Sequence, residues 1–149
     1  MSDIILSNEV YESVRIKRSD GKVLSEFFFN PSDANIVERY DDFVDGLKEL
    51  SDKIKDYEIM KEKGNELDKT KNALKEISAE ICQKVDKLLN NEVSDKIFSV
   101  MGPLSPLPNG DYYFVFIVEQ IGIKIKNSTG QRLKKMEMKI KKHTAKYHG

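Results

Sequence analysis

The sequence predicts an α+β fold that is mainly α. Three observations lead to this prediction: an Asp-Gly pair between two apolar segments near the start, a long run of regularly spaced apolar residues, and a proline-rich stretch in the second half. We expect an N-terminal β-hairpin, a long antiparallel helical hairpin, a Pro-rich packed loop and a C-terminal helix. A chain of 149 residues with 39% hydrophobic and 34% charged residues fits one domain with a modest core.

This single domain, residues 1–149, divides into four expected parts: the β-hairpin at 1–30, the helical hairpin at 31–94, the Pro-rich connector at 95–110, and the C-terminal helix with a basic tail at 111–149.

Residues 10–30 are expected to form the β-hairpin. Asp20-Gly21 supplies the positive φ angles that a tight primed turn requires. Two strands alone are not stable, so their apolar residues need cover from the helices or from a neighbouring copy of the chain. The aromatic run at residues 27–29 predicts that both faces of the second strand are at least partly buried.

A long helix is expected from the junction at residues 30–33 to about Lys61. Proline fits the first turn of a helix, and Ser32 or Asp33 can accept hydrogen bonds from its free amides. Apolar residues then alternate in four- and three-residue steps, which indicates a narrow seam packed against another helix. The seam is either an ordinary core or, in part, a contact between subunits. Its members are Ile36, Tyr40, Phe43, Leu47, Leu50, Ile54 and Tyr57.

A second amphipathic helix is expected after a left-handed stop at Gly64-Asn65, and it should end near Asn90 or Ser94. A short turn between two such helices predicts an antiparallel helical hairpin. Cys82, the only cysteine, is expected to be a small buried hydrophobic residue rather than a reactive thiol. The apolar stripe consists of Leu67, Leu74, Ile77, Ile81, Val85, Leu88 and Leu89.

The connector at residues 95–110 is expected to be a packed loop. Its three prolines and two glycines forbid a continuous helix, and the apolar residues between them can anchor it on the core.

The stretch at residues 111–126 allows two interpretations. It has strong strand propensity, but its apolar residues also follow a helical stripe. We favour a helix that continues through Leu133, Met136 and Ile140, with Gly130 as its weak point.

The formal net charge is zero, but the charges are separated along the chain. Acidic residues crowd the first long helix, whereas the end of the chain is almost purely basic. Such a chain can attract copies of itself, so a homo-oligomer is expected. For the basic tail we favour a solvated or protein-docking role over nucleic-acid binding, because no aromatic residues are interleaved with the lysines as a platform for base stacking. The tail residues considered are Arg132, Lys134, Lys135, Lys139, Lys141 and Lys142.

Enzymatic chemistry is not expected. The only histidines, His143 and His148, lie in the terminal basic segment, and no phosphate-binding loop or metal-ligand spacing occurs. We therefore predict no catalytic residue, no cofactor and no metal site. No apolar run reaches the roughly 18 to 20 residues of a membrane span, and the start lacks the features of a signal peptide. The expected location is the cytoplasm, without a membrane partner.

Two segments carry a family resemblance. The first is FFFNPSDANIVERY at residues 27–40, and the second combines DKIF at 95–98, PLSP at 103–106 and NGDYY at 109–113. They resemble a family of small proteins encoded in the tail-gene region of phages and prophages of Gram-positive bacteria, in the place typical of tail assembly chaperones. The matched stretches cover about a third of the chain.

The resemblance implies a non-catalytic tail assembly chaperone in the host cell cytoplasm. Such a protein would bind the tape-measure and tail-tube proteins through amphipathic helices and a strand edge. The basic tail would then meet acidic tube subunits. Two alternatives remain open: a tail completion component of the virion, and a nucleic-acid-binding accessory protein that uses the basic C-terminus. The expected contact residues are Phe27, Phe29, Tyr40, Phe43 and Tyr113.

Overall fold

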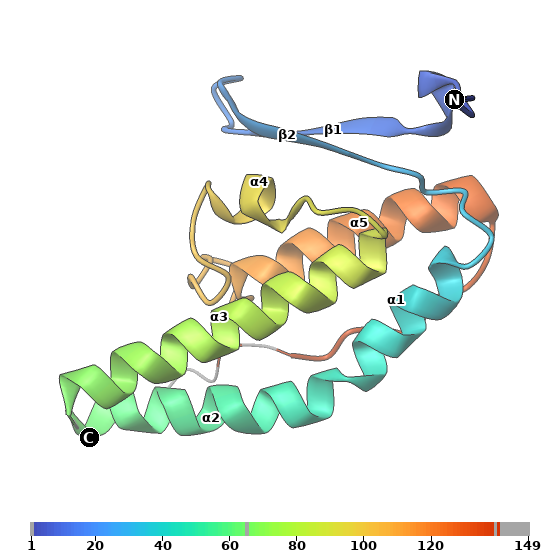
Figure 1. Cartoon of the computed structure of the whole chain (residues 1–149). Coiled ribbons are helices and arrows are strands. Elements are labelled where there is room, and N and C mark those ends of the chain that lie inside the picture. Colours follow the sequence, from blue (N-terminus) through green and yellow to red (C-terminus); the bar gives the residue numbers. More distant parts are fainter. Residues whose placement is uncertain (1, 65, 139, 141–149) are drawn as a thin grey trace.

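The protein is a β-hairpin set above a group of packed helices, as predicted (Figure 1). This computed structural model describes residues 2–64, 66–138 and 140. A 3-10 turn, η1 (Asn8–Val10), precedes strands β1 (Glu12–Lys17) and β2 (Val23–Phe29), which pair antiparallel. The α-helices are α1 (Ile36–Asp45), α2 (Leu47–Lys63), α3 (Leu67–Leu89), α4 (Ser94–Phe98) and α5 (Tyr113–Thr129).

The turn of the hairpin has a different type from the one expected. Gly21 has φ +95°, but no other residue of the turn has a positive φ, which excludes the primed turn with two such residues. Instead, the Arg18 amide donates to the Lys22 carbonyl at 2.9 Å, and the Gly21 amide donates to the Arg18 carbonyl at 3.0 Å. This is a three-residue loop with glycine in the left-handed position, which also suits the right-handed twist of the strands.

Only one face of β2 is buried. Phe27 and Phe29 are 2% and 1% exposed, whereas Phe28 between them is 48% exposed. The sequence predicts that both faces are at least partly buried, and on the outer face Phe28 is covered over only about half of its surface. Successive strand residues point to opposite faces, and here the helices cover only the inner one.

The long helix expected after the hairpin is two helices preceded by turns. Residues 31–35 form turns, in which the Asp33 carboxylate accepts a hydrogen bond from the Asn35 amide at 2.9 Å, so α1 starts later than expected. Gly46, at φ −73° and ψ −9°, then separates α1 from α2. All seven residues of the predicted seam are buried, so the break changes the helix direction without exposing the seam.

The helical hairpin is closed by left-handed residues at two helix ends. Gly64 ends α2 at φ +61°, and Asn90 ends α3 at φ +51°. Helix α3 packs against α1, α2 and α4, and its buried stripe runs from Ile77 to Leu89. Leu67, placed on that stripe by the sequence, is 66% exposed at the start of α3.

The connector is packed, as expected, and includes the short helix α4. The Tyr113 hydroxyl donates to the Ile97 carbonyl at 2.8 Å, and the Phe114 amide donates to the Pro103 carbonyl at 3.0 Å. These bonds hold the connector against the first turn of α5. The ambiguous stretch is helical, and eight residues of α5 are buried, too many for a helix with only one face on the core.

The C-terminal helix is shorter than predicted. Gly130 ends α5 at φ +70°, and the described residues beyond it are not helical. They run back along the molecule, and the Ile140 amide donates to the Gly110 carbonyl at 2.9 Å. Met136 and Met138 are both buried, at 7% and 8% exposure. Residues two apart share a face only in an extended segment, so this packing replaces the expected helix.

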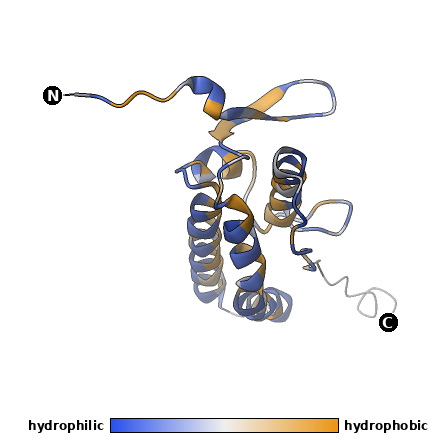
Figure 2. Cartoon of the chain, turned by 90° about the vertical axis from the view of Figure 1, so that its right-hand side faces the viewer, coloured by the Kyte–Doolittle hydropathy of each residue, from blue (hydrophilic) through white to orange (hydrophobic). Residues whose placement is uncertain are grey.

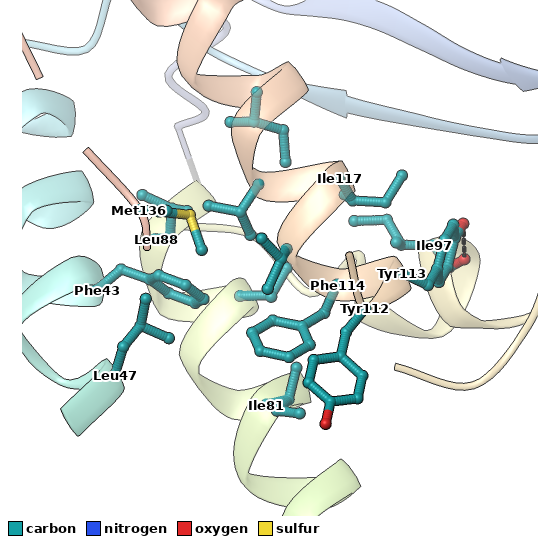
Figure 3. Close-up of a cluster of buried hydrophobic side chains, with 14 of the residues drawn as sticks. Phe43, Leu47, Ile81, Leu88, Ile97, Tyr112, Tyr113, Phe114, Ile117 and Met136 are labelled. Carbon is teal, nitrogen blue, oxygen red and sulfur yellow. Dashed lines mark hydrogen bonds between the residues drawn. The ribbon is translucent and has the colours of Figure 1, made fainter. Parts of the chain in front are cut away.

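The core lies where α1, α3, α5 and the returning C-terminal segment meet. Figure 3 shows Phe43, Leu88, Phe114 and Met136 converging from these four segments. Phe114 and Ile81 are 0% exposed. The core therefore joins distant parts of the chain into one unit.

Candidate protein-interaction surface

Exposed apolar side chains gather in the N-terminal part of the molecule. Among the described residues, twelve large hydrophobic side chains are exposed, and eight of these lie between residues 4 and 28. Isolated apolar residues on a surface need no explanation, but such a concentration is typical of an interaction site. The eight are Ile4, Ile5, Leu6, Val10, Tyr11, Val23, Leu24 and Phe28.

The first part of this surface is an N-terminal arm, residues 2–7. Ile4, Ile5 and Leu6 are 97%, 87% and 61% exposed. The Ser7 hydroxyl accepts a hydrogen bond from the Glu9 amide at 3.2 Å and so caps η1, which separates the arm from β1. Figure 2 shows the arm running away from the body of the molecule. The arm is not among the residues predicted to contact a partner, although its apolar triplet between polar residues ahead of a hairpin is a signal in the sequence.

The second part is the outer edge of β1. The sheet has two strands, so each strand has one edge without a strand partner. The edge of β2 is partly occupied, because the Asn91 side-chain amide donates to the Phe28 carbonyl at 3.0 Å and α4 packs against the strand. Within the described residues, β1 therefore presents the more open edge, and an open edge is a template for another strand.

A groove runs between β1 and α5. Its volume is about 340 Å³, and it is lined by residues 13–17 of β1 and by Phe27 of β2. At one end, Lys124 on α5 lies 3.6 Å from the Glu12 carboxylate. The groove thus has an apolar floor and polar residues at its sides. The α5 residues that line it are Phe116, Ile117, Gln120, Ile121 and Lys124.

The third part is the outer face of the hairpin, which we define as Tyr11, Leu24 and Phe28. Tyr11 and Phe28 line a shallow hollow together with Asn8, Asn90 and Asn91. The three apolar residues are 44%, 38% and 48% exposed. Large side chains that are half covered can bury further area against a partner without a change of fold.

The five residues expected to contact a partner are core residues in this structure. Phe27, Phe29, Tyr40, Phe43 and Tyr113 are between 1% and 5% exposed. They leave almost no surface free for another chain, and of the five only Phe27 lines the groove between β1 and α5. Sequence reasoning placed them correctly on apolar faces, but those faces pack within the chain. The exposed N-terminal residues are the candidates instead.

The basic tail is turned, in its described part, toward the acidic helix α1. The Lys134 ammonium lies 2.8 Å from the Asp45 carboxylate, and the Lys134 amide donates to the Asp41 carboxylate at 3.0 Å. The hydrogen bond to Asp45 raises the pKa of Lys134. Arg132 and Lys135 are exposed beside it. Lys139, Lys141 and Lys142 lie outside the described residues.

The two segments that carry the family resemblance position the hairpin on the helices. In the first, the Arg39 guanidinium donates to the Leu88 carbonyl at 2.9 Å and lies 3.2 Å from the Asp33 carboxylate. The Asn35 amide and this guanidinium lower the pKa of Asp33. The second segment contains α4, which packs against β2. These residues do not form the candidate surface themselves. They hold the hairpin that carries it against the helices.

The described residues contain no group of three or more His, Cys, Asp or Glu side chains arranged to hold a metal ion. Both histidines lie outside these residues. Cys82 is only partly buried, less than the sequence predicts, and this burial raises the pKa of its thiol. In the part of the chain that the structure describes, no helix has the length and apolar character to cross a bilayer.

Comparison with protein-family models, with curated proteins and with solved structures gave no match for this chain.

Proposed function

We propose that this protein is a non-catalytic phage tail assembly protein, a chaperone that binds the tape-measure and tail-tube proteins in the host cell cytoplasm. The support is twofold. The residues at 27–40 and 95–113 resemble that family, and the structure has an exposed apolar surface around its hairpin. The observation that carries the proposal is the concentration of exposed apolar side chains in the N-terminal part of the chain.

The client surface in this proposal is the outer face of the hairpin rather than the helical seam. The seam residues are buried between the protein's own helices, so they have no free area for a client. Tyr11 and Phe28, by contrast, flank a shallow hollow on the surface. An amphipathic client helix needs a shallow apolar strip of this kind on which to bury one face. A long tape-measure protein has many such helices to shield before the tail tube encloses it.

The test is co-expression with the tape-measure protein encoded in the same gene cluster. We expect the chaperone to increase the soluble fraction of the tape-measure protein and to co-purify with it. A double variant, Leu24→Ser with Phe28→Ser, should lose most of this effect. The matched control is Ile59→Ser with Ile123→Ser, which removes side chains of similar exposure, 47% and 52%, from α2 and α5. This control should behave like the parent protein.

Two outcomes would contradict the proposal. One is a tape-measure protein whose solubility does not depend on this chain. The other is the presence of the protein in purified phage particles at a fixed copy number, because an assembly chaperone is left behind when the tail is complete.

A further inference from the structure

We propose that the N-terminal arm of a second copy of this chain adds to β1 as a third, antiparallel strand and fills the groove between β1 and α5. The two copies would exchange arms, so that each provides one arm and one groove. This inference concerns the isolated protein and does not depend on the function proposed above.

The groove offers what a third strand needs. One side is the open edge of β1, where the backbone groups that point away from β2 can pair with an added strand. The floor is apolar, with Val14 and Ile16 from β1 and Ile121 from α5. Val14 and Ile16 are only partly buried, so an added strand would complete their burial.

The arm has the matching shape and composition. Residues 3–7 have no helix or strand of their own, and each residue of their apolar triplet has more than half of its surface exposed. In extended form, five residues span roughly 16 Å, the same as residues 13–17 of β1. The arm leaves η1 away from the body of its own chain (Figure 2), which directs it toward another molecule.

One antiparallel register of the arm against β1 places the apolar arm residues in the groove and also sets opposite charges across from each other. With Ile4 opposite Ile16, Leu6 falls opposite Val14, and both arm residues point into the groove because residues two apart share a face. Ile5 then points outward, opposite Arg15. A shift by one residue would place Ile5 alone in the groove and expose the other two. A shift by two residues keeps the same face but sets Leu6 opposite Glu12, or Ile4 opposite Arg18, so only this register gives both arm residues apolar partners.

Charge complementarity supports the same register. Asp3 falls opposite Lys17 at one end of the groove. Opposite charges directly across an antiparallel pair are favourable, by roughly 0.2 to 1 kcal/mol. At a formal net charge of zero, little overall repulsion opposes the pairing of two copies.

An exchange of arms closes as a two-fold dimer. Each copy has one arm and one open edge, so the same contact forms twice and leaves neither feature unused. A dimer of this kind covers Ile4 and Leu6 of both copies, which are 97% and 61% exposed in the free chain.

Sedimentation of the full chain over a range of concentrations tests the proposal. We expect a monomer–dimer equilibrium. The double variant Ile4→Asp with Leu6→Asp should weaken dimerisation by at least a hundredfold, whereas Ile5→Asp should change it by less than tenfold. A chain that stays monomeric at all concentrations overturns the proposal. Equal sensitivity at all three positions overturns it too, because it indicates unspecific association of an apolar segment.

Disulfide trapping distinguishes two arrangements. In one the arm binds β1 of a second copy, and in the other it folds back onto β1 of its own chain. In a Cys82→Ser background, Leu6→Cys combined with Val14→Cys should form a covalent dimer on oxidation, visible on a non-reducing gel. The out-of-register control, Leu6→Cys with Arg15→Cys, should form much less. A disulfide within a single chain, or equal trapping in both registers, would overturn the arm exchange.

Discussion

The phenol ring of Tyr40 on α1 lies against the backbone of Gly122 on α5. A Cβ atom at position 122 would stand 2.7 Å from Tyr40 Oη and 2.9 Å from Tyr40 Cζ, closer than non-bonded atoms approach without displacement. The ring is 4% exposed and is held on the core side of α1. The absence of a side chain at Gly122 therefore permits the close contact of these two helices.

We predict that Gly122→Ala destabilises the protein. Alanine is favoured over glycine in a helix interior by about 1 kcal/mol, but overpacking a core costs about 1 to 3 kcal/mol. The rigid ring of Tyr40 cannot move aside as a flexible side chain would. The difference of these two effects lowers the free energy of unfolding by up to about 2 kcal/mol, measured by urea titration.

Gly46→Ala is the matched control, with the opposite sign expected. Gly46 has a helical φ of −73°, and the nearest atom to an added Cβ is the ammonium of Lys84, the mobile end of its side chain, at 3.2 Å. Alanine there restricts the unfolded chain at little cost to the folded one, so stability should be unchanged or rise by up to about 1 kcal/mol. Equal destabilisation at both positions would show that the Tyr40 contact is not the cause.

Alkaline pH should destabilise the fold through its buried tyrosines. Burial raises the pKa of Tyr40, Tyr112 and Tyr113 to about 12, above the value of 10.0 expected when unfolded. Between these two values the unfolded chain has lost protons that the folded chain keeps. Stability from these groups is therefore fully present below pH 10 and is lost as the pH rises toward 12.

Tyr40→Phe tests this dependence, since phenylalanine keeps the ring and has no proton to lose. We expect the variant to lose about 2 kcal/mol less stability than the parent protein between pH 9 and pH 12. Circular dichroism in urea, repeated at several pH values, measures the difference in slope. Parallel curves for variant and parent would contradict the raised pKa of Tyr40.

Most of the fold could be predicted from the spacing of apolar residues, because burial repeats with the helix period. The seam from Ile36 to Tyr57 is buried throughout, and the left-handed residues Gly64 and Asn90 close the helices near where the sequence indicates. The break between α1 and α2 at Gly46 was not predicted, because the spacing of the apolar seam residues continues across it without a shift. A glycine inside a helical pattern indicates a break only weakly.

The C-terminal segment and the candidate surface were harder to predict. Leu133, Met136 and Ile140 have helical spacing, yet Met136 and Met138 pack as an extended segment after the turn at Gly130. The apolar positions suit both conformations, and only the packing decides between them. In the same way, composition alone does not show whether an apolar residue is buried, so the sequence does not distinguish the buried Phe27 and Phe29 from the exposed residues of the arm.

Asp86 should be a stabilising residue at the junction of α3 and α4. Its carboxylate accepts hydrogen bonds from the amides of Val93 and Ser94, at 2.9 and 2.8 Å, and from the Ser94 hydroxyl at 2.9 Å. Asp86→Ala leaves these donors without their acceptor, so we expect a loss of about 1 to 3 kcal/mol in thermal or urea unfolding. Asp56→Ala, at an exposed position of α2, is the control and should change stability by less than about 0.5 kcal/mol.

The returning segment after Gly130 should be held by apolar burial rather than by charge. Lys134 and Asp45 form an ion pair whose side chains are 51% and 58% exposed, and exposed pairs contribute about 0 to 1 kcal/mol. Met136 is 7% exposed and packs into the core beside Leu88 and Phe43 (Figure 3), where truncation to alanine costs about 2 to 5 kcal/mol.

We therefore predict that Met136→Ala lowers the free energy of unfolding by at least about 2 kcal/mol, while Lys134→Ala lowers it by less than about 1 kcal/mol. Raising the salt concentration should reduce only the second effect, because salt screens an exposed ion pair but does not weaken apolar burial. Urea titrations at two salt concentrations measure both variants. A larger loss for Lys134→Ala would mean that attraction to the acidic helix α1, rather than burial, keeps the basic segment on the molecule.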